Sequence, residues 1–138
     1  MLFDNTNNEH MFKSFFLAQL FVFTPFVLQD SGLIKHIVRS WSNGEPYVVF
    51  YTEGPENERV KEELYFENGG LDYVGYYKNG KEHGEWKYFW ENGNVKSVEF
   101  YERGVEEGTM YDYNEKGEAT VKYRYVHGDL MSRMILNP

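Results

Sequence analysis

The sequence contains no cysteine, and only 4 of its 138 residues are prolines. Without cysteine the chain cannot form a disulfide, a thiolate metal site, a cysteine nucleophile or a lipidated N-terminal cysteine. Basic residues are also few, because 14 Lys and Arg stand against 22 Asp and Glu and give a formal net charge of −8. A surface this acidic does not favour binding to nucleic-acid phosphates or to anionic lipid headgroups.

Aromatic residues and glycines are abundant by contrast. Aromatic side chains make up 19% of the chain, and there are 13 glycines. This composition is typical of a folded, turn-rich β protein rather than of a disordered acidic tail. The length is that of one domain.

The N-terminal region differs from the rest of the chain, because residues 15–28 are apolar or uncharged throughout. This run is shorter than the roughly 20 residues that span a membrane, but it fits the apolar core of a secretory signal. Counted from Met11, the only charged residue before the run is Lys13, which gives the positive start that such signals have. We therefore expect Met11 to be the true initiator, or residues 1–10 to be an upstream extension.

The sequence around the run leaves the processing open. No Ala-x-Ala site follows it, and Pro25 interrupts it. We predict that residues 1–31 are an N-terminal extension plus a signal peptide or membrane anchor, and that the protein is exported or membrane-associated. The alternative is a cytoplasmic protein in which this segment is a helix packed on the domain.

Residues 32–138 are predicted to form a single repeat domain, because turn glycines recur with a fixed spacing. The gaps between these glycines alternate between 11 and 13 residues, so the period is 24 residues, and it is clearest over residues 60–130. Aromatic residues recur in register with the glycines, as in the column of Tyr77, Tyr101 and Tyr125. The structural turn glycines are Gly69, Gly80, Gly93, Gly104, Gly117 and Gly128.

Each 24-residue unit has two turns and therefore two strands. Residues 85–90 and 96–101 alternate in polarity, and both faces of the expected strands carry aromatic rings. This pattern predicts an all-β fold, a single-layer antiparallel meander of tandem β-hairpins. Residues 37–51 are expected to be a degenerate first hairpin, followed by a longer loop around Gly54 and Pro55. Residues 130–138 are expected to be a last strand or a cap in which Met131, Met134, Ile135 and Leu136 shield the open end.

One unit of the repeat has a distinctive pattern of glycine, aromatic and asparagine residues. The pattern consists of Tyr77, Gly80, Gly84, Trp86, Phe89, Asn92 and Gly93. With these residues, residues 78–108 resemble the MORN-variant repeat of YwqK-type antitoxins and of many related bacterial proteins. The second copy departs from the pattern, because Met110 replaces the tryptophan and Lys116 replaces the asparagine. The resemblance implies a hairpin array that acts as an interaction scaffold.

Choline-binding repeats are a competing assignment, since they are also aromatic hairpins with Asn-Gly turns. Their unit is shorter, and pairs of tryptophans build cation cages between their hairpins. The 24-residue period and the single cluster of Trp86 and Trp90 argue against them.

We find no pattern that predicts an enzyme. His36, His83 and His127 lack the spacing of metal ligands. The repeated glutamates Glu67 and Glu91 precede turn glycines, where exposed acidic residues are ordinary. No phosphate-binding loop or serine elbow is present. We therefore predict no catalytic residues, no metal and no cofactor.

The predicted function is protein binding. Trp86, Tyr88 and Trp90 alternate along one expected strand, so they are predicted to share a face and to anchor a basic protein partner. Glu85, Glu91 and Glu99 are expected to steer the approach of that partner. A basic toxin domain is one such partner, which makes an antitoxin or immunity protein the most specific form of this prediction. The alternative is an exported cell-envelope protein that binds membrane or a surface polymer.

Overall fold

The computed structural model describes residues 32–137 and contains no helix there, hence no helix able to cross a membrane. The signal-like residues 15–28 and the choice between Met1 and Met11 lie outside the described residues. The strands are β1 (Ile34–Ser40), β2 (Pro46–Glu53), β3 (Glu58–Tyr65), β4 (Leu71–Lys78), β5 (Lys81–Glu82), β6 (Gly84–Phe89), β7 (Val95–Glu102), β8 (Val105–Glu106), β9 (Gly108–Tyr113), β10 (Ala119–Val126) and β11 (Asp129–Ile135).

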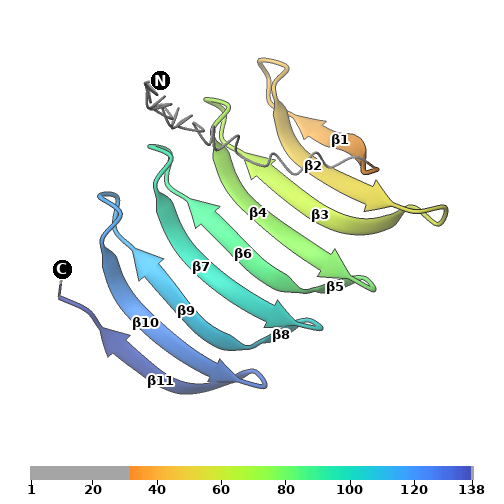
Figure 1. Cartoon of the computed structure of the whole chain (residues 1–138). Coiled ribbons are helices and arrows are strands. Elements are labelled where there is room, and N and C mark those ends of the chain that lie inside the picture. Colours follow the sequence, from red (N-terminus) through yellow and green to blue (C-terminus); the bar gives the residue numbers. More distant parts are fainter. Residues whose placement is uncertain (1–31, 138) are drawn as a thin grey trace, which may run out of the picture.

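The strands form one open, antiparallel sheet in which each long strand pairs with the next one in the chain. The order is β1-β2-β3-β4-β6-β7-β9-β10-β11, while β5 pairs with β4 and β8 pairs with β7. Figure 1 shows a curved ladder of strands without a second layer, with β1 and β11 at its two edges. The predicted all-β, single-layer meander of hairpins is therefore confirmed.

Two-residue turns of one kind close three of the hairpins at one end of the sheet. Asn79, Arg103 and His127 have φ values of 52°, 56° and 52°, and each is followed by a glycine with positive φ. Two successive residues with positive φ are typical of type I′ turns, whose twist matches that of the strands they join. The structure thus confirms the predicted turns at Gly80, Gly104 and Gly128. It also confirms those at Gly69, Gly93 and Gly117, whose φ values are 82°, 85° and 84°.

The second arm of the repeated hairpin bends next to a glycine. In one unit β5 and β6 are separated by His83, and in the next unit β8 and β9 are separated by Glu107. The following Gly84 and Gly108 have φ values of 83° and 90°. The turn of the next hairpin binds beside each bend, because the amide of Gly104 donates to the carbonyl of Glu82 at 2.8 Å. The bend therefore lets successive hairpins stay hydrogen-bonded as the sheet curves.

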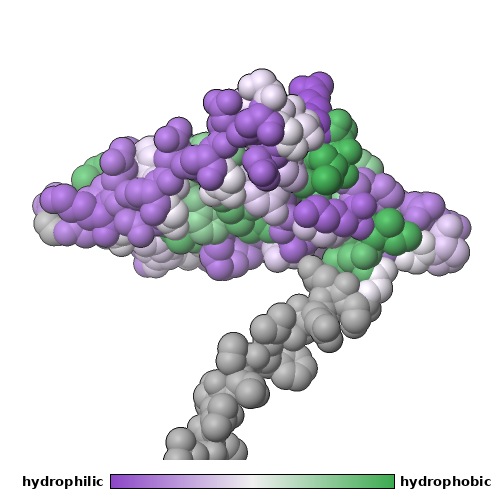
Figure 2. Space-filling model, turned by 90° about the horizontal axis from the view of Figure 1, so that it is seen from above, coloured by the Kyte–Doolittle hydropathy of each residue, from purple (hydrophilic) through white to green (hydrophobic). Residues whose placement is uncertain are grey.

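Both faces of the sheet carry side chains that pack on one another, and the surface remains largely polar. Val49, Trp86 and Met110 are the apolar residues that the sheet buries most completely within residues 32–137. The view in Figure 2 shows hydrophilic side chains over much of the surface, with hydrophobic patches between them. A single layer has no deep core, so aromatic rings spanning neighbouring strands supply the burial.

Two predictions about the ends of the sheet need correction. The segment around Gly54 and Pro55 is a short connection and not a long loop, because β2 runs to Glu53 and β3 already begins at Glu58. The C-terminal residues form strand β11 but do not shield the end of the sheet. Every residue of β11 is exposed, including Met131 at 63% and Met134 at 59%. The reason is that β11 pairs only with β10 and lies flat in the layer.

Candidate binding pocket between two hairpin loops

Four loops of similar construction line one end of the sheet, and we name them by their residues: the 41–45, 66–70, 90–94 and 114–118 loops. In each, the amide of the first residue donates to the carbonyl of the fifth, as from Phe66 to Gly70 at 2.8 Å and from Trp90 to Asn94 at 2.8 Å. Because the strands follow chain order, these loops lie side by side along the same end of the sheet (Figure 1).

Side-chain hydrogen bonds tie most of these loops to the next one. The indole Nε1 of Trp41 donates to the carbonyl of Tyr65 at 3.0 Å, and Asn43 Nδ2 donates to the carbonyl of Glu67 at 3.2 Å. These two bonds join the 41–45 loop to the 66–70 loop.

The same two bonds recur further along the sheet. Trp90 Nε1 donates to the carbonyl of Tyr113 at 3.2 Å, and Asn92 Nδ2 donates to the carbonyl of Glu115 at 2.8 Å. They join the 90–94 loop to the 114–118 loop. A tryptophan followed two residues later by an asparagine is therefore the device that links neighbouring loops.

The device is interrupted between the 66–70 and 90–94 loops. Phe66 occupies the place of the tryptophan, and its ring has no N–H to donate. Asn68 uses its Oδ1 within its own loop, where it accepts from the amide of Gly70 at 2.8 Å. Within residues 32–137, no side-chain hydrogen bond joins these two loops as the others are joined. The two loops are thus left unconnected at their tips.

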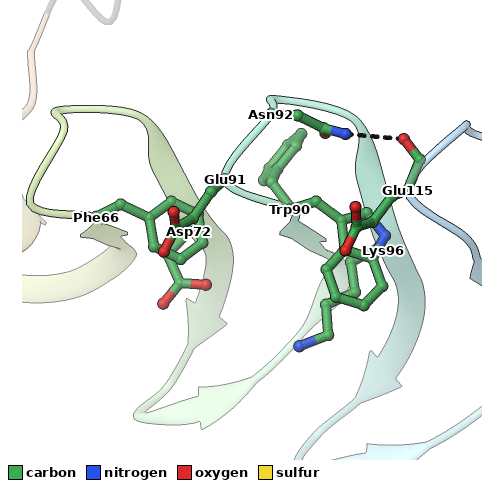
Figure 3. A pocket seen from close by; sticks show the side chains of 8 residues that line it. Phe66, Asp72, Trp90, Glu91, Asn92, Lys96 and Glu115 are labelled. Atoms are coloured by element: carbon green, nitrogen blue, oxygen red, sulfur yellow. Dashed lines mark hydrogen bonds between the residues drawn. The ribbon is translucent and has the colours of Figure 1, made fainter.

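An open pocket lies at this interruption. Its volume is about 490 Å³, and a neighbouring hollow of about 410 Å³ lies between Phe66 and Glu91 at the loop tips. Figure 3 shows the side chains that line the larger one, which come from the 66–70, 90–94 and 114–118 loops and from the strands beside them. Its lining consists of Phe66, Asp72, Phe89, Trp90, Glu91, Asn92, Lys96 and Glu115.

The pocket combines aromatic walls with an excess of negative charge. Three residues with carboxylates, Asp72, Glu91 and Glu115, line the pocket together with one lysine, Lys96. The Lys96 Nζ lies 4.9 Å from the centre of the Trp90 ring, which places the cation over an aromatic face. Burial raises the pKa of Asp72, while the nearby Lys96 partly opposes this shift. The lining of the pocket therefore has an excess of acidic over basic residues.

The three aromatic residues predicted to contact a partner differ in burial and in position. Trp86 is only 6% exposed, because its ring packs against those of Tyr73, Tyr77 and Tyr101, with centroid distances of 5.7, 5.4 and 5.8 Å. Tyr88 is half-buried beside Tyr73. Trp86 and Tyr88 both contact Tyr73, whereas Trp90 lies beyond the end of β6 at Phe89 and begins the following loop.

The three glutamates predicted to steer a partner are also separated. Glu91 is exposed on the 90–94 loop and lines the pocket. Glu99 accepts a hydrogen bond from the Tyr101 hydroxyl at 2.8 Å, and burial raises the pKa of its carboxyl. Glu85 pairs with Lys87 at 2.6 Å. Of the six predicted contact residues, the pocket therefore includes Trp90 and Glu91.

Sequence reasoning missed Phe66, Asp72 and Lys96. The signal for Phe66 was present, because Trp41 and Trp90 occupy equivalent loop positions and Phe66 departs from them. Lys96 reaches the pocket because a register shift follows the Tyr88–Ser97 pair, so that Phe89 faces Val95 and not Lys96. Such a bulge has no clear signature in one sequence.

Tyr77, from the repeated tyrosine column, packs within the sheet. The Tyr77 hydroxyl donates to Glu62 at 2.9 Å, and its ring contacts Trp86. For Tyr88, burial followed by the charges of Glu99 and Asp72 raises the pKa to about 12. This hydroxyl therefore stays neutral at physiological pH.

Residues 32–137 also hold no group of three or more His, Asp or Glu side chains placed to bind a metal ion.

Comparison with known proteins gives a distant likeness and no family. No protein-family model matches the sequence, and no curated protein sequence matches it either. Among solved structures, the chain is similar to part of a crystal structure of accessory secretory proteins 1, 2 and 3 from Streptococcus pneumoniae, with a TM-score of 0.46 and 20% identity. The likeness covers 69% of this chain and 17% of that one.

Proposed function

We propose that the protein is a non-enzymatic binding module that docks a basic protein partner at the ends of its hairpin loops. The observation that carries this proposal is the pocket at the interrupted link, whose lining combines three acidic residues and one lysine with aromatic side chains. Negative potential steers a basic partner towards the surface, and aromatic side chains provide contact area once it has docked.

The formal net charge of −8 supports the same partner chemistry, since it speeds encounter with a basic protein at low salt. An antitoxin or immunity protein that neutralises a basic toxin domain remains the most specific form of the proposal. The resemblance to MORN-variant repeats, which serve as interaction scaffolds, agrees with it.

A site-specific cross-linking experiment tests the proposal in cells of the source organism. A photo-reactive amino acid replaces Asn92 at the rim of the pocket, and in a matched variant it replaces Asn79 at the opposite end of the sheet. Both asparagines are in loops, but only Asn92 lies near the carboxylates of the pocket. We expect position 92 to capture a distinct protein of high isoelectric point that position 79 does not capture.

The capture should also weaken as salt rises, because the attraction between exposed charges is screened over about 10 Å at 0.1 M salt. Capture of the same proteins from both positions, or of acidic proteins only, would contradict the proposal. Folding of each variant is checked by its circular-dichroism melt.

A further inference from the structure

We propose that the pocket between the 66–70 and 90–94 loops is a receptor for one arginine side chain of the partner. This inference rests on the proposed function and adds the chemical group that the site takes. The volume of about 490 Å³ leaves room for a side chain of this size. The pocket lies where the link between two loops is missing. The loop pairs that are tied by tryptophan and asparagine therefore do not reproduce it.

The walls of the pocket suit a flat cation. Phe66, Phe89 and Trp90 supply aromatic faces, on which a guanidinium group stacks. Asp72 comes from β4, which follows the 66–70 loop, and Glu91 comes from the 90–94 loop, so both neighbouring hairpins supply a carboxylate (Figure 3). A carboxylate accepts two parallel hydrogen bonds from a guanidinium group, a geometry that an ammonium group cannot form.

A cationic side chain of the protein itself already lies over one of these aromatic rings. The Lys96 ammonium lies 4.9 Å from the centre of the Trp90 ring, which shows that this aromatic face accepts a cation. Lys96 belongs to β7 and is exposed, so its long side chain has water on one side and can swing away. An incoming guanidinium group therefore competes with Lys96 for the ring and for the carboxylates.

Arginine is preferred to lysine for a further reason. The pocket is open and half polar, so a strongly hydrated ammonium group gains little by leaving water for it. The guanidinium group is more weakly hydrated and stacks on rings while its edges bind carboxylates. Arginine is also enriched at the centres of protein interfaces.

Titrations with small probes test the inference without the partner. N-acetyl-arginine methylamide is added to the full chain labelled with ¹⁵N, and the Trp90 indole N–H signal is followed by NMR. The matched probes are N-acetyl-lysine methylamide, which keeps the charge, and N-acetyl-citrulline methylamide, which keeps the shape but is neutral. We expect the arginine probe to shift the Trp90 signal, with an affinity at least about threefold above that of lysine, and citrulline to have no effect.

Three variants locate the binding site. Asp72→Asn removes one carboxylate and should weaken arginine binding by about fivefold or more. Burial disfavours the charge of Asp72, so the neutral amide is no harder to bury and the fold should be kept. Lys96→Met removes the internal competitor and should strengthen binding about threefold or more. Asp129→Asn is the control, because this exposed residue begins β11 at the other end of the hairpin.

Each outcome of the titrations either supports or contradicts the inference. Equal shifts from arginine and citrulline, equal affinities for arginine and lysine, or no shift at all would overturn the inference. An arginine affinity that Lys96→Met lowers would do the same. If the arginine probe fails while position 92 still captures a basic protein, only this inference falls. If the probe binds and no basic partner is captured, the pocket stands and the proposed function falls.

Discussion

Position 75 shows how closely one residue is fitted in this sheet. A Cβ atom on Gly75 would lie 2.4 to 2.5 Å from the ring atoms of Trp86, a distance that real contacts do not reach. The backbone at Gly75 does not have positive φ, so only space, and not conformation, demands glycine there. Trp86 lies across the strand on this bare backbone, and that is how a tryptophan becomes 94% buried in a single layer.

We predict that Gly75→Ala destabilises the protein by about 1–3 kcal/mol, the usual cost of overpacking a well-filled site. On strand propensity alone the change should be stabilising, so the sign of the effect is decisive. Urea denaturation measures it. The double variant Gly75→Ala with Trp86→Phe should recover part of the loss relative to Trp86→Phe alone, because the smaller ring leaves room for the methyl group. A loss that is the same in both backgrounds would show that the Trp86 ring is not the cause.

At the scale of the strands, β2 and β3 are joined by a network around one carboxylate. Glu63 accepts hydrogen bonds from the hydroxyls of Tyr51 and Tyr65, each at 2.6 Å, and pairs with Lys61 at 3.0 Å. Burial alone would raise the pKa of Glu63, but the two hydroxyls and the Lys61 ammonium outweigh burial and lower it. The ionised form therefore contributes stability above the ordinary value of 4.5, and this contribution is lost as the pH falls through the lowered pKa.

We predict that Glu63→Gln lowers the stability by about 1 kcal/mol or more at pH 7, because the charge-assisted hydrogen bonds are lost. The difference in Tm from the parent should narrow as the pH is lowered below 4.5, since the parent then loses the same interactions. Thermal melts at pH 7 and pH 3.5 measure it. Glu53→Gln, at the exposed end of β2, should change the Tm little at either pH. A difference for Glu63→Gln that is constant with pH would contradict the assignment.

Local signals in the sequence were enough to predict the strands and turns. Alternating polarity and a turn glycine with positive φ act within a few residues, so a 24-residue period of such signals defines the hairpins and their order. The contact residues were harder to predict, because they depend on pairing between strands. Trp90 was placed on a strand, whereas β6 ends at Phe89, just past a register shift, and Trp90 begins the next loop.

The pocket depends on still longer-range structure. Asp72 and Glu115 are far apart in the chain, and only the stacking of hairpins brings them to one site. The departure that opens this site, Phe66 in place of tryptophan, has meaning only once the indole hydrogen bonds of Trp41 and Trp90 are known.

At the scale of the whole molecule, residues 15–28 predict where the protein acts. If they are an export signal, the protein should be found outside the cytoplasm, shortened by about 20–30 residues or held at the membrane. Cell fractionation followed by intact-mass measurement checks this expectation. Full-length protein that is soluble in the cytoplasm would contradict it and favour an antitoxin that meets its toxin there.

The interrupted link also has a mechanical meaning. The sheet is a single layer, and the hydrogen bonds of the indole and amide side chains link neighbouring hairpins along one of its ends. Phe66 leaves this link out at one place, and we expect the sheet to bend most easily there. We expect a cation bound by Asp72 and Glu91 to join the two hairpins, and so to stiffen the sheet and fix its curvature.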